Sequence, residues 1–371
     1  MVETVLVTGG AGFIGRAVVA RLVEQGHRVR ILDALIEQVH GDAGWPAPLP
    51  TMAECIAGDV RDAAAVERAL SGVDAVIHLA AEVGVGQSMY EVERYTAVNE
   101  LGSAILFEKL IGRPIRRVVT ASSMSIYGEG LYRDADGKLV ENARRIGVRD
   151  QQRQWNPLDA EGRPLIPVAT PETKRPSLES IYALGKYVQE RQTHIMAQAY
   201  GFEAVCLRLF NVYGPGQALS NPYTGVLAIF ASRLMNGERP MIFEDGEQRR
   251  DFVHLDDVAR AFCDALTVPA AAGHTLNIGS GVDRSVREIA QTLADALGRG
   301  ELTPEIVGKA RIGDIRHCFC DTRLARDVMG FEAREDFAAG LQRLAAWVSE
   351  QRPTDRVATA RAELDARGLV S

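Results

Sequence analysis

Thr8-Gly9-Gly10-Ala11-Gly12-Phe13-Ile14-Gly15 is the stretch of sequence that decides the fold. It follows the apolar, β-branched run Thr4–Val7 and opens a stretch with helical spacing, Phe13–Glu24. Glycines three residues apart allow a tight turn, a close approach of the backbone to a pyrophosphate, and close packing of a helix on a strand. The N–H groups that begin the helix also favour a phosphate. The stretch predicts a dinucleotide site that includes Gly9, Gly12, Phe13, Ile14 and Gly15.

Short apolar runs alternate with helical stretches through the first 125 residues. Alternation of this kind builds parallel sheets that are covered by helices. We therefore predict an α/β fold with a doubly wound parallel (Rossmann) sheet, followed by a smaller C-terminal α/β substrate lobe. The predicted strands after Thr4–Val7 are Val29–Leu32, Cys55–Ala57, Ala75–Leu79 and Arg117–Ala121, and the predicted helices between the later ones are Ala63–Leu70 and Val92–Leu110.

The chain of 371 residues is longer than one nucleotide-binding domain needs. We expect that domain over residues 1–202, and a substrate lobe mainly over residues 203–350, with some chain returning to the first domain. The segment Leu131–Arg175, inside the first domain, is polar with little period, which predicts a long insertion or loop. Residues 351–371 are expected to form a tail, either a polar linker with a short helix or a frayed end.

Composition excludes several classes of partner. The chain has 42 basic and 49 acidic residues and a net charge of −7, so no general attraction to nucleic acid or to an anionic membrane is expected. No apolar run approaches the ~18 residues of a membrane span, and no basic leader precedes the first apolar run. Five scattered cysteines argue against a disulfide framework and for a reducing cytoplasm. Cys318-Phe319-Cys320 has no partner pair elsewhere, so no metal site is predicted.

Three strand ends supply further candidates for the cofactor site. Asp33 ends the second strand, where its carboxylate can accept hydrogen bonds from both adenosine ribose hydroxyls and would repel a 2′-phosphate, which favours NAD over NADP. Asp59 follows the third strand and can meet the adenine amino group, with Val60 on the ring, although capping of the next helix is the alternative for Asp59. The fourth strand ends in a segment where the backbone can approach the cofactor, at Leu79, Ala80 and Ala81.

Tyr182 and Lys186 are four residues apart and share one face of a predicted helix. A cation beside a phenol lowers its pKa from ~10, so that the tyrosine can act as a general base. Ser123 ends the fifth strand, on the sheet edge where folds of this class bind ligands, and can hydrogen-bond the reacting oxygen; Ser125 is the second choice. The predicted catalytic residues are therefore Ser123, Tyr182 and Lys186, although an isolated Tyr-x-x-x-Lys is more often a solvated helix face.

Taken in order, the glycine turn, Asp33, Asp59, Ser123 and the Tyr182/Lys186 pair resemble the extended short-chain dehydrogenases/reductases. The most similar members are the NAD-dependent nucleotide-sugar epimerases and dehydratases, and the resemblance spans about residues 3–350. It implies that the cofactor is NAD, that the substrate is a dTDP- or UDP-sugar, and that Asn99 joins the cofactor-binding residues. It also implies oxidation of the sugar at C4, with Tyr182 as the base.

The resemblance implies substrate contacts in the second half of the chain as well. Asn211 lies in a segment, Arg208–Gly216, that resembles the one contacting the substrate in this family, and Arg250 resembles the arginine that grips the diphosphate. Arg316 resembles a nucleotide contact of the later lobe; each arginine taken singly is as readily a surface ion pair. The other implied substrate residues are Gln87, Ser88, Ser123, Ser125, Asn221, Tyr223 and Thr224, with an ordinary polar loop as the alternative for Gln87 and Ser88.

The residues after Ser123 indicate which reaction follows the oxidation. In the 4,6-dehydratases an acidic pair stands there, whereas this chain has Met124 and Ser125, so the resemblance implies 4-epimerisation. Four stretches are similar to the dTDP-L-rhamnose 4-epimerases, which make dTDP-6-deoxy-L-talose: Ser122–Arg133, Ala169–Lys186, Gln217–Phe230 and Gly313–Asp321. A nucleotide-sugar 4-ketoreductase, another UDP- or dTDP-sugar epimerase, and a dinucleotide-sensing module are the alternatives. Helices around Val92–Leu110 and Ile181–Ala199 resemble the pair that builds a dimer interface in this family, which implies a homodimer.

Overall fold

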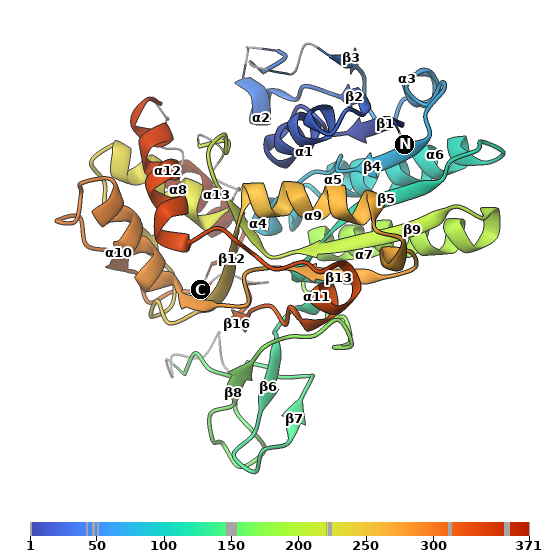
Figure 1. Cartoon of the computed structure of the whole chain (residues 1–371). Helices are drawn as coiled ribbons and strands as arrows, with labels where there is room; N and C mark the ends of the chain where they lie inside the picture. Colours follow the sequence, from blue (N-terminus) through green and yellow to red (C-terminus); the bar gives the residue numbers. More distant parts are fainter. Residues whose placement is uncertain are drawn as a thin grey trace.

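The computed structural model describes residues 2–41, 44–46, 49, 52–145, 154–219, 221, 225–310, 314–351 and 357–370. Its centre is a seven-stranded sheet in which every neighbouring pair of strands is parallel (Figure 1). The predicted doubly wound α/β fold is thereby confirmed. In spatial order the strands are β13 (Thr275–Ile278), β9 (Glu203–Leu209), β5 (Arg117–Ser123), β4 (Ala75–His78), β1 (Thr4–Thr8), β2 (Arg28–Asp33) and β3 (Ala53–Ala57).

Both faces of this sheet are covered by helices, so its central strands are buried along their whole length. Successive side chains of β1 point to opposite faces, and they enter two separate cores. Val5 and Val7 pack with α1 (Phe13–Glu24) and α9 (Leu255–Thr267), while Leu6 packs on the other side. The second core is closed by α3 (Ala63–Ala69), α6 (Gly102–Leu110) and α7 (Ile181–Tyr200).

The strand order reverses at β1, which lies between β2 and β4. At such a switch point the connections leave toward opposite sides and open a crevice beyond the carboxyl ends of the strands. Thr8, His78 and Ser123 are the last residues of β1, β4 and β5 and therefore mark the same edge of the sheet.

The helix expected over Val92–Leu110 contains a π-helical turn. It consists of α5 (Val92–Thr96), the π-turn Ala97–Leu101 and α6. Asn99 projects from the π-turn into the protein, where its side chain accepts the N–H of Glu82 at 2.8 Å and donates to the Glu82 carbonyl at 3.1 Å. The extra residue in this turn thus lets a helical side chain fix the segment that follows β4, a use typical of π-bulges near functional sites.

A second lobe is built by the later part of the chain. Its sheet joins β12 (Arg249–His254) to β10 (Asn211–Tyr213), β14 (Asp283–Ser285) and β16 (His317–Cys318). Three helices pack around a common apolar core beside this sheet. They are α8 (Val226–Met235), α10 (Val286–Ala296) and α12 (Phe337–Ser349). β9 and β13 come from the same part of the chain but extend the central sheet.

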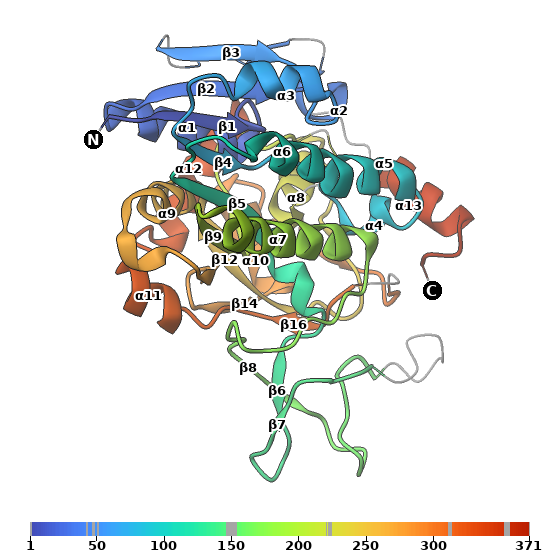
Figure 2. The same ribbon diagram turned by 90° about the vertical axis from the view of Figure 1, so that its right-hand side faces the viewer.

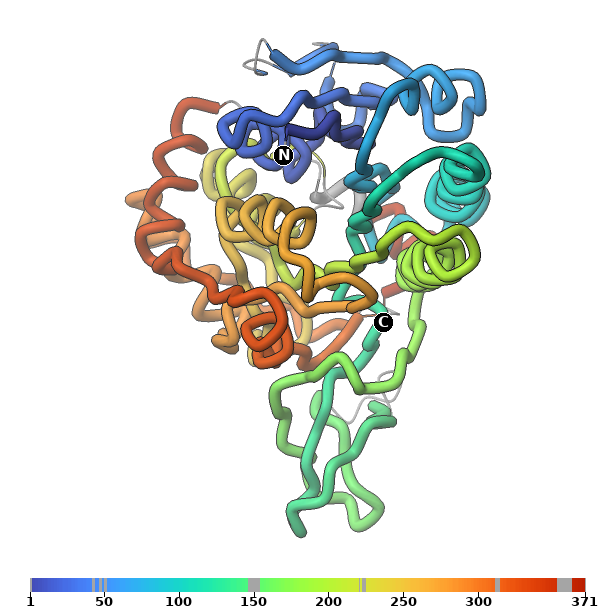
Figure 3. The backbone as a smooth tube through the Cα atoms, turned by 45° about the vertical axis from the view of Figure 1, so that its right-hand side comes forward, coloured from blue at the N-terminus to red at the C-terminus, as the bar shows by residue number. Residues whose placement is uncertain are grey.

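The segment expected to be a loop, Leu131–Arg175, contains a small antiparallel sheet of order β7-β6-β8, a difference from the prediction. Figures 2 and 3 show this arm projecting from the two lobes. Its strands are β6 (Leu131–Arg133), β7 (Leu139–Val140) and β8 (Ile166–Val168).

This arm contains two turns of similar sequence, Asp134–Lys138 and Asp159–Arg163, which are stabilised in the same way. In each turn the aspartate accepts backbone N–H groups two and four residues later, at distances of 2.8–3.0 Å. Arg163 then links the two turns by donating to Asp136 at 3.1 Å. The strands have two or three residues each, and their apolar cluster of Tyr132, Ala143 and Leu165 comes from distant positions, so no local sequence period revealed them.

A buried ion pair joins α7 to the central sheet near Ser123. Arg208 on β9 contacts both carboxylate oxygens of Glu190 on α7, at 3.0 and 2.7 Å, and Ser122 donates to Glu190 at 2.8 Å. Less than a tenth of either ionic side chain is exposed. The pair therefore has little contact with water, and loss of one member leaves the other charge without compensation.

We expect Arg208→Met to lower the free energy of unfolding by about 3–5 kcal/mol, because Glu190 would remain buried without its cation. Urea denaturation followed by circular dichroism measures this change. The double variant Arg208→Met/Glu190→Gln is the control, and it should recover part of the loss since no charge is left stranded. A single variant within 1 kcal/mol of the wild type would contradict the expectation.

The tail contains α13 (Val357–Ala366), which agrees with the short-helix alternative for this segment. Its described end lies beside α4 (Val85–Ser88) and α5 (Figure 2). Across the ranges that the structure describes, no helix is both long and apolar enough to cross a membrane.

Candidate active site

A cavity of about 630 Å³ lies at the carboxyl edge of the central sheet and extends to the second lobe. Most residues predicted from the sequence line it: Gly9, Gly12, Phe13, Ile14, Gly15, Asp33, Asp59, Val60, Leu79, Ala80, Ala81, Ser123, Ser125, Tyr182, Lys186, Asn211, Asn221 and Arg250. Four others do not line it: Gln87, Ser88, Asn99 and Arg316. Tyr223 and Thr224 lie outside the described residues.

The glycine turn packs closely against neighbouring backbone and leaves the first N–H groups of α1 without a side-chain cap. A Cβ at Gly15 would lie 2.2 Å from the Gly9 oxygen, and a Cβ at Gly9 would lie 2.8 Å from the Ala80 nitrogen, so neither position accepts a side chain. Gly12 is the N-cap of α1 and offers no side-chain hydrogen bond to the first N–H groups of the helix. Those groups are therefore available to an anion, as a dinucleotide pyrophosphate requires.

Asp33 lies at the edge of the cavity with its orientation fixed. Its carboxylate accepts N–H bonds from Ala11 at 3.0 Å and from Leu35 at 2.9 Å, and it lies 3.5 Å from Nε2 of His40. Each carboxylate oxygen has further lone pairs, so a ribose hydroxyl can still be bound. The glycine turn and Asp33 together have the shape and chemistry that NAD requires.

Asp59 is not the cap of the following helix, because Asp62 accepts the capping N–H of Ala64 at 2.9 Å. Asp59 instead forms two hydrogen bonds with the Arg61 guanidinium, at 3.0 and 2.6 Å. This contact keeps the pKa of Asp59 below its usual range. A negative carboxylate therefore stands at the cavity wall beside Val60.

Ser123 and Tyr182 both line the cavity, and the Ser123 hydroxyl is close enough to influence the pKa of the Tyr182 phenol. The Ser125 hydroxyl donates to Ser123 Oγ at 2.9 Å, which leaves the Ser123 proton free to be donated elsewhere. Tyr182 lies in the first turn of α7, whose N-cap is Ser180. Enclosure by the protein raises the pKa of Tyr182, and the Ser123 hydroxyl acts in the opposite direction. The positive end of the α7 dipole also favours a phenolate at this position.

Lys186 differs from the expectation that it lowers the pKa of Tyr182. Its ammonium donates to Gln189 Oε1 at 2.8 Å, and burial lowers the pKa of Lys186 to about 7. Gln189 in turn donates to Ser103 at 2.8 Å and contacts His78 at 3.1 Å. Burial, with the nearby Lys186 charge, lowers the pKa of His78 to about 3, so this histidine is neutral at pH 7. Lys186 is therefore held by a neutral network behind the cavity.

The depressed pKa of Lys186 has a consequence for stability. The unfolded chain holds this proton up to its usual pKa of 10.5, whereas the folded protein releases it near pH 7. Between these values the unfolded state binds more protons, so the contribution of Lys186 to folding becomes more favourable as the pH rises, and it is least favourable below pH 7.

In cofactor-free protein we therefore expect Lys186→Met to raise the melting temperature, most at pH 6 and progressively less toward pH 9. Thermal unfolding followed by circular dichroism measures the difference at each pH. Lys138→Met is the control, because Lys138 is exposed on the projecting arm. A gain that is the same at all pH values would show that the Lys186 charge is not destabilised by burial.

Arg250 presents a guanidinium to the substrate-lobe side of the cavity. It donates to the carbonyl oxygens of Arg249 and Arg316, each at 2.9 Å, and to that of Ile315. Among the described residues no carboxylate forms an ion pair with it. A cation held by carbonyl groups keeps its charge available for an anionic ligand.

Arg316 does not reach the cavity, because acidic neighbours hold it elsewhere. Its guanidinium donates to Glu244 at 2.8 Å and to Asp245 at 2.6 and 3.0 Å, and it also contacts Asn156. Arg145 of the projecting arm forms a second ion pair with Glu244. These contacts fasten the arm to the second lobe.

Gln87, Ser88 and Asn99 are likewise engaged inside the protein. Gln87 accepts a hydrogen bond from Tyr95 at 3.1 Å, and the Ser88 hydroxyl donates to the Val85 carbonyl at 2.7 Å. Asn99 binds the backbone of Glu82, as described above. These three side chains therefore form contacts within the protein and do not line the cavity.

Sequence reasoning missed two glutamines of the second lobe. Side-chain oxygens of Asn211, Gln217 and Gln248 are buried and have no hydrogen-bond partner in the described structure, and all three residues line the cavity. Gln217 and Gln248 use their amide nitrogens to bind the carbonyls of Val212 and Phe243. Three side chains of the cavity wall thus carry a buried acceptor that has no partner in the described structure. No local signal marks such residues, because ordinary surface glutamines look the same in sequence.

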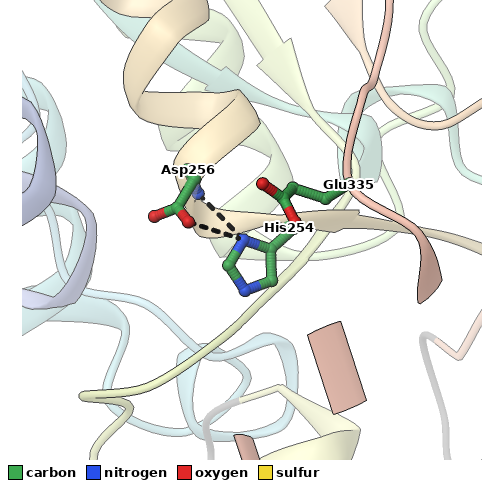
Figure 4. A group of neighbouring side chains, drawn as sticks. All are labelled: His254, Asp256 and Glu335. Atoms are coloured by element: carbon green, nitrogen blue, oxygen red, sulfur yellow. Dashed lines mark hydrogen bonds and ion pairs between the residues drawn. The ribbon is translucent and has the colours of Figure 1, made fainter. Parts of the chain in front are cut away.

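One cluster of metal-binding residue types lies outside the cavity. His254, Asp256 and Glu335 have ligand atoms within 4.8 Å of one another (Figure 4). Arg343 occupies this cluster, since its guanidinium contacts His254 at 3.2 Å, Asp256 at 3.2 Å and Glu335 at 2.6 Å. The group is therefore an arginine site in this structure. Cys318 and Cys320 are both buried thiols.

The sequence was compared with those of known protein families and characterised proteins. Residues 5–145 and 159–279 match the model of the NAD dependent epimerase/dehydratase family. A dTDP-L-rhamnose 4-epimerase of Burkholderia thailandensis is 36% identical over 94% of this chain and 96% of its own length. A putative UDP-glucose 4-epimerase of Methanocaldococcus jannaschii is 31% identical, over 94% of this chain and its whole length.

Solved structures agree with this assignment. The UDP-glucose 4-epimerase of Thermotoga maritima, solved with UDP-glucose, has a TM-score of 0.75 and 30% identity, covering 94% of this chain and 99% of its own. The UDP-glucose 4-epimerase of Thermus thermophilus in complex with NAD has a TM-score of 0.74 and 29% identity, covering 94% and 100%. Sequence, fold and cavity therefore show that the chain belongs to the NAD-dependent epimerase/dehydratase family, with NAD as the cofactor and epimerisation of a nucleotide sugar as the class of reaction.

Proposed function

We propose that the protein interconverts the C4 epimers of a nucleotide-activated 6-deoxysugar, with dTDP-L-rhamnose and dTDP-6-deoxy-L-talose as the pair. The observation that carries this proposal is the placement of Ser123, Tyr182 and Lys186 in one cavity with a dinucleotide turn. Met124 and Ser125 have no acidic side chain, which disfavours loss of water from the sugar. The similarity to a dTDP-L-rhamnose 4-epimerase along nearly the whole chain supports the choice of sugar.

NAD would be held by the glycine turn and by residues at the carboxyl ends of the neighbouring strands. The first N–H groups of α1 would bind its pyrophosphate, Asp33 would bind the adenosine ribose, and Asp59 with Val60 would contact the adenine. Lys186 reaches the nicotinamide ribose, which gives its ammonium a ligand beyond Gln189. When bound, NAD accepts a hydride from C4 of the sugar and returns it.

Tyr182 and Ser123 handle the proton of the C4 hydroxyl. Ser123 would donate its proton to the sugar oxygen, and Tyr182, acting as a phenolate, would accept the hydroxyl proton as the C4 hydrogen leaves as hydride. Rotation of the 4-keto sugar in the cavity would present its other face for return of the hydride. Tyr182 finally returns the proton to the C4 oxygen, so no external acid, base or reductant is consumed.

The second lobe holds the nucleotide part of the substrate. Arg250 offers its guanidinium to the diphosphate, and the unpartnered oxygens of Asn211, Gln217 and Gln248 accept hydrogen bonds from N–H and O–H groups of the base and sugar. Arg316 has no part in this scheme, because Glu244 and Asp245 already neutralise it.

The reaction is tested by incubating purified protein with dTDP-L-rhamnose in D2O without added reductant. Proton NMR should show the talo epimer with every carbon-bound hydrogen retained, because the hydride moves directly and solvent exchange is confined to O–H groups. Deuterium at C3 or C5 would indicate enolisation and overturn the proposed chemistry. No conversion of dTDP-L-rhamnose, together with stoichiometric oxidation of NADH or NADPH when the corresponding 4-keto sugar is supplied, would identify a 4-ketoreductase instead.

A UDP-hexose 4-epimerase is the second candidate, favoured by the UDP-glucose 4-epimerases among the relatives and neighbours. The same assay with UDP-glucose decides between the two. A kcat/KM for UDP-glucose above that for dTDP-L-rhamnose would assign the protein to this candidate.

We further propose that the protein is a homodimer in a reducing compartment such as the cytoplasm. Apolar side chains are exposed on the helices expected to form the interface: Val92, Leu101, Leu184 and Ile195. All five cysteines are free thiols, in keeping with a reducing environment. Light scattering coupled to gel filtration should give twice the chain mass of 40.3 kDa, and Leu101→Lys/Ile195→Lys should give a monomer.

A further inference from the structure

The C-terminal segment returns to the cavity after crossing the second lobe. Leu364, near the end of α13, is buried, and it lines the cavity together with Leu369 in the following turn. The Leu369 N–H donates to the Leu364 carbonyl at 2.9 Å and holds the turn closed. Two leucines from the end of the chain therefore form part of the cavity wall.

Specific contacts fix this segment on the residues after β4. The Tyr90 hydroxyl donates to Glu363 at 3.0 Å, and the Arg367 guanidinium lies 4.2 Å from the centre of the Tyr90 ring. A Cβ placed at Gly86 would lie 3.7 Å from a Leu364 methyl group, which is ordinary contact distance. Helix α13 is thus seated against α4 through both polar and apolar contacts.

Helix α13 lies against residues that follow β4, and these residues line the same cavity as Tyr182. Helix α4 packs against α7, the helix that carries Tyr182. Tyr95 binds Gln87 of α4 through its hydroxyl and lies close enough to Tyr182 for their charges to interact. Leu364 therefore lines the cavity beside Gly86, in the segment that follows β4.

We infer that Leu364 and Leu369 form an apolar wall of the sugar site and select a sugar with a methyl group in place of the C6 hydroxymethyl. This inference rests on the proposed function, because it concerns the same substrate. A methyl group gains from burial against leucine, whereas a hydroxyl there loses its hydrogen bonds to water. An apolar wall discriminates against an added hydroxyl by up to about 100-fold. The preference for a 6-deoxysugar would thus come from two leucines of the C-terminal segment.

The test uses dTDP-L-rhamnose and dTDP-L-mannose, which differ only by the hydroxyl at C6. The wild type should prefer dTDP-L-rhamnose in kcat/KM, and Leu364→Asn/Leu369→Asn should reduce this preference at least tenfold by offering polar groups to the hydroxyl. Leu364→Met/Leu369→Met, which stays apolar, should keep the preference. Ala366→Ser, on the exposed side of α13, is the matched control. NAD content and melting temperature of each variant show whether it is folded.

A chemical labelling experiment tests the position of the segment without catalysis. In a Cys55→Ser background, which removes the exposed thiol, Leu369→Cys should react with iodoacetamide, and saturating dTDP should leave that rate unchanged while dTDP-L-rhamnose slows it at least fivefold. Equal labelling rates with and without the nucleotide sugar would overturn the placement.

The outcomes separate the two proposals. If the wild type acts on dTDP-L-rhamnose but the asparagine variant keeps the same preference, the wall does not select the sugar and the inference is wrong. If the wild type acts only on hydroxymethyl sugars, both the proposed 6-deoxysugar and the selection are wrong. Labelling of Leu369→Cys in the presence of the sugar that is turned over then still decides whether the segment lies at the site.

Discussion

Replacing Tyr182 by phenylalanine is expected to reduce kcat about 1000-fold while the protein still binds NAD. General acid–base catalysis contributes about 10²–10⁴-fold, and in the proposed mechanism the Tyr182 oxygen takes and returns the C4 proton. The variant loses this oxygen but keeps the ring and its place in the first turn of α7. The glycine turn and Asp33, which fix the cofactor, are unchanged. Initial rates from NMR or coupled chromatography measure kcat, and absorbance of the denatured supernatant measures NAD.

Tyr187→Phe is the matched control for this experiment. Tyr187 lies on the same helix, one residue after Lys186, and does not line the cavity. We expect its activity within twofold of the wild type. A Tyr182→Phe variant that keeps a tenth or more of wild-type kcat would remove Tyr182 from the role of base. Loss of NAD together with activity would instead indicate a structural role.

The second large effect is expected for Gly15→Ala, which should purify without NAD and melt at a lower temperature. The new Cβ would lie 2.2 Å from the Gly9 oxygen and 2.6 Å from the Gly10 Cα, so α1 must move away from the turn. Forcing an atom into a packed site costs about 1–3 kcal/mol, and sometimes more. Displacement of α1 would also move the N–H groups that are proposed to bind the pyrophosphate. Thermal unfolding and NAD content measure both consequences.

Gly12→Ala provides a contrast within the same turn. The nearest atom to a Cβ at Gly12 is the Gly9 oxygen at 3.3 Å, so the fold needs only a small adjustment. The extra methyl nevertheless stands where the pyrophosphate approaches the backbone. We expect nearly unchanged thermal stability with weaker NAD binding. If Gly12→Ala were the more destabilising of the two variants, the packing explanation for Gly15 would fail.

Features that depend on local sequence were predictable. Apolar runs fixed the strands of the first half, and α7 begins at Ile181 as its helical spacing indicated. The motifs at Ser123 and Tyr182 pointed to one sheet edge, and one cavity contains both. Gln189 was also within reach of sequence reasoning, since it lies three residues after Lys186 on the same helix face.

Features that depend on distant partners were not predictable. Arg316 resembled a phosphate-binding arginine. It instead forms ion pairs with Glu244 and Asp245, which lie about seventy residues earlier in the chain. Asn99 faces the Glu82 backbone because it lies in a π-helical turn. No residue pattern in the sequence predicts that turn. Leu364 reaches the cavity only because of the path taken by the tail. In each case a side chain of unremarkable type is assigned by tertiary structure.

The place of β9 in the central sheet has a consequence for how the chain is made. β5 is buried on both faces and pairs on one side with β9, which the ribosome delivers only after the projecting arm and α7. Until then the growing chain presents an open apolar strand edge, the kind of surface that recruits other chains. We therefore do not expect the nucleotide-binding half to fold well by itself. A gene fragment ending at residue 202 would encode a sheet in which β5 lacks its neighbour β9, and this exposed strand edge would favour aggregation during synthesis.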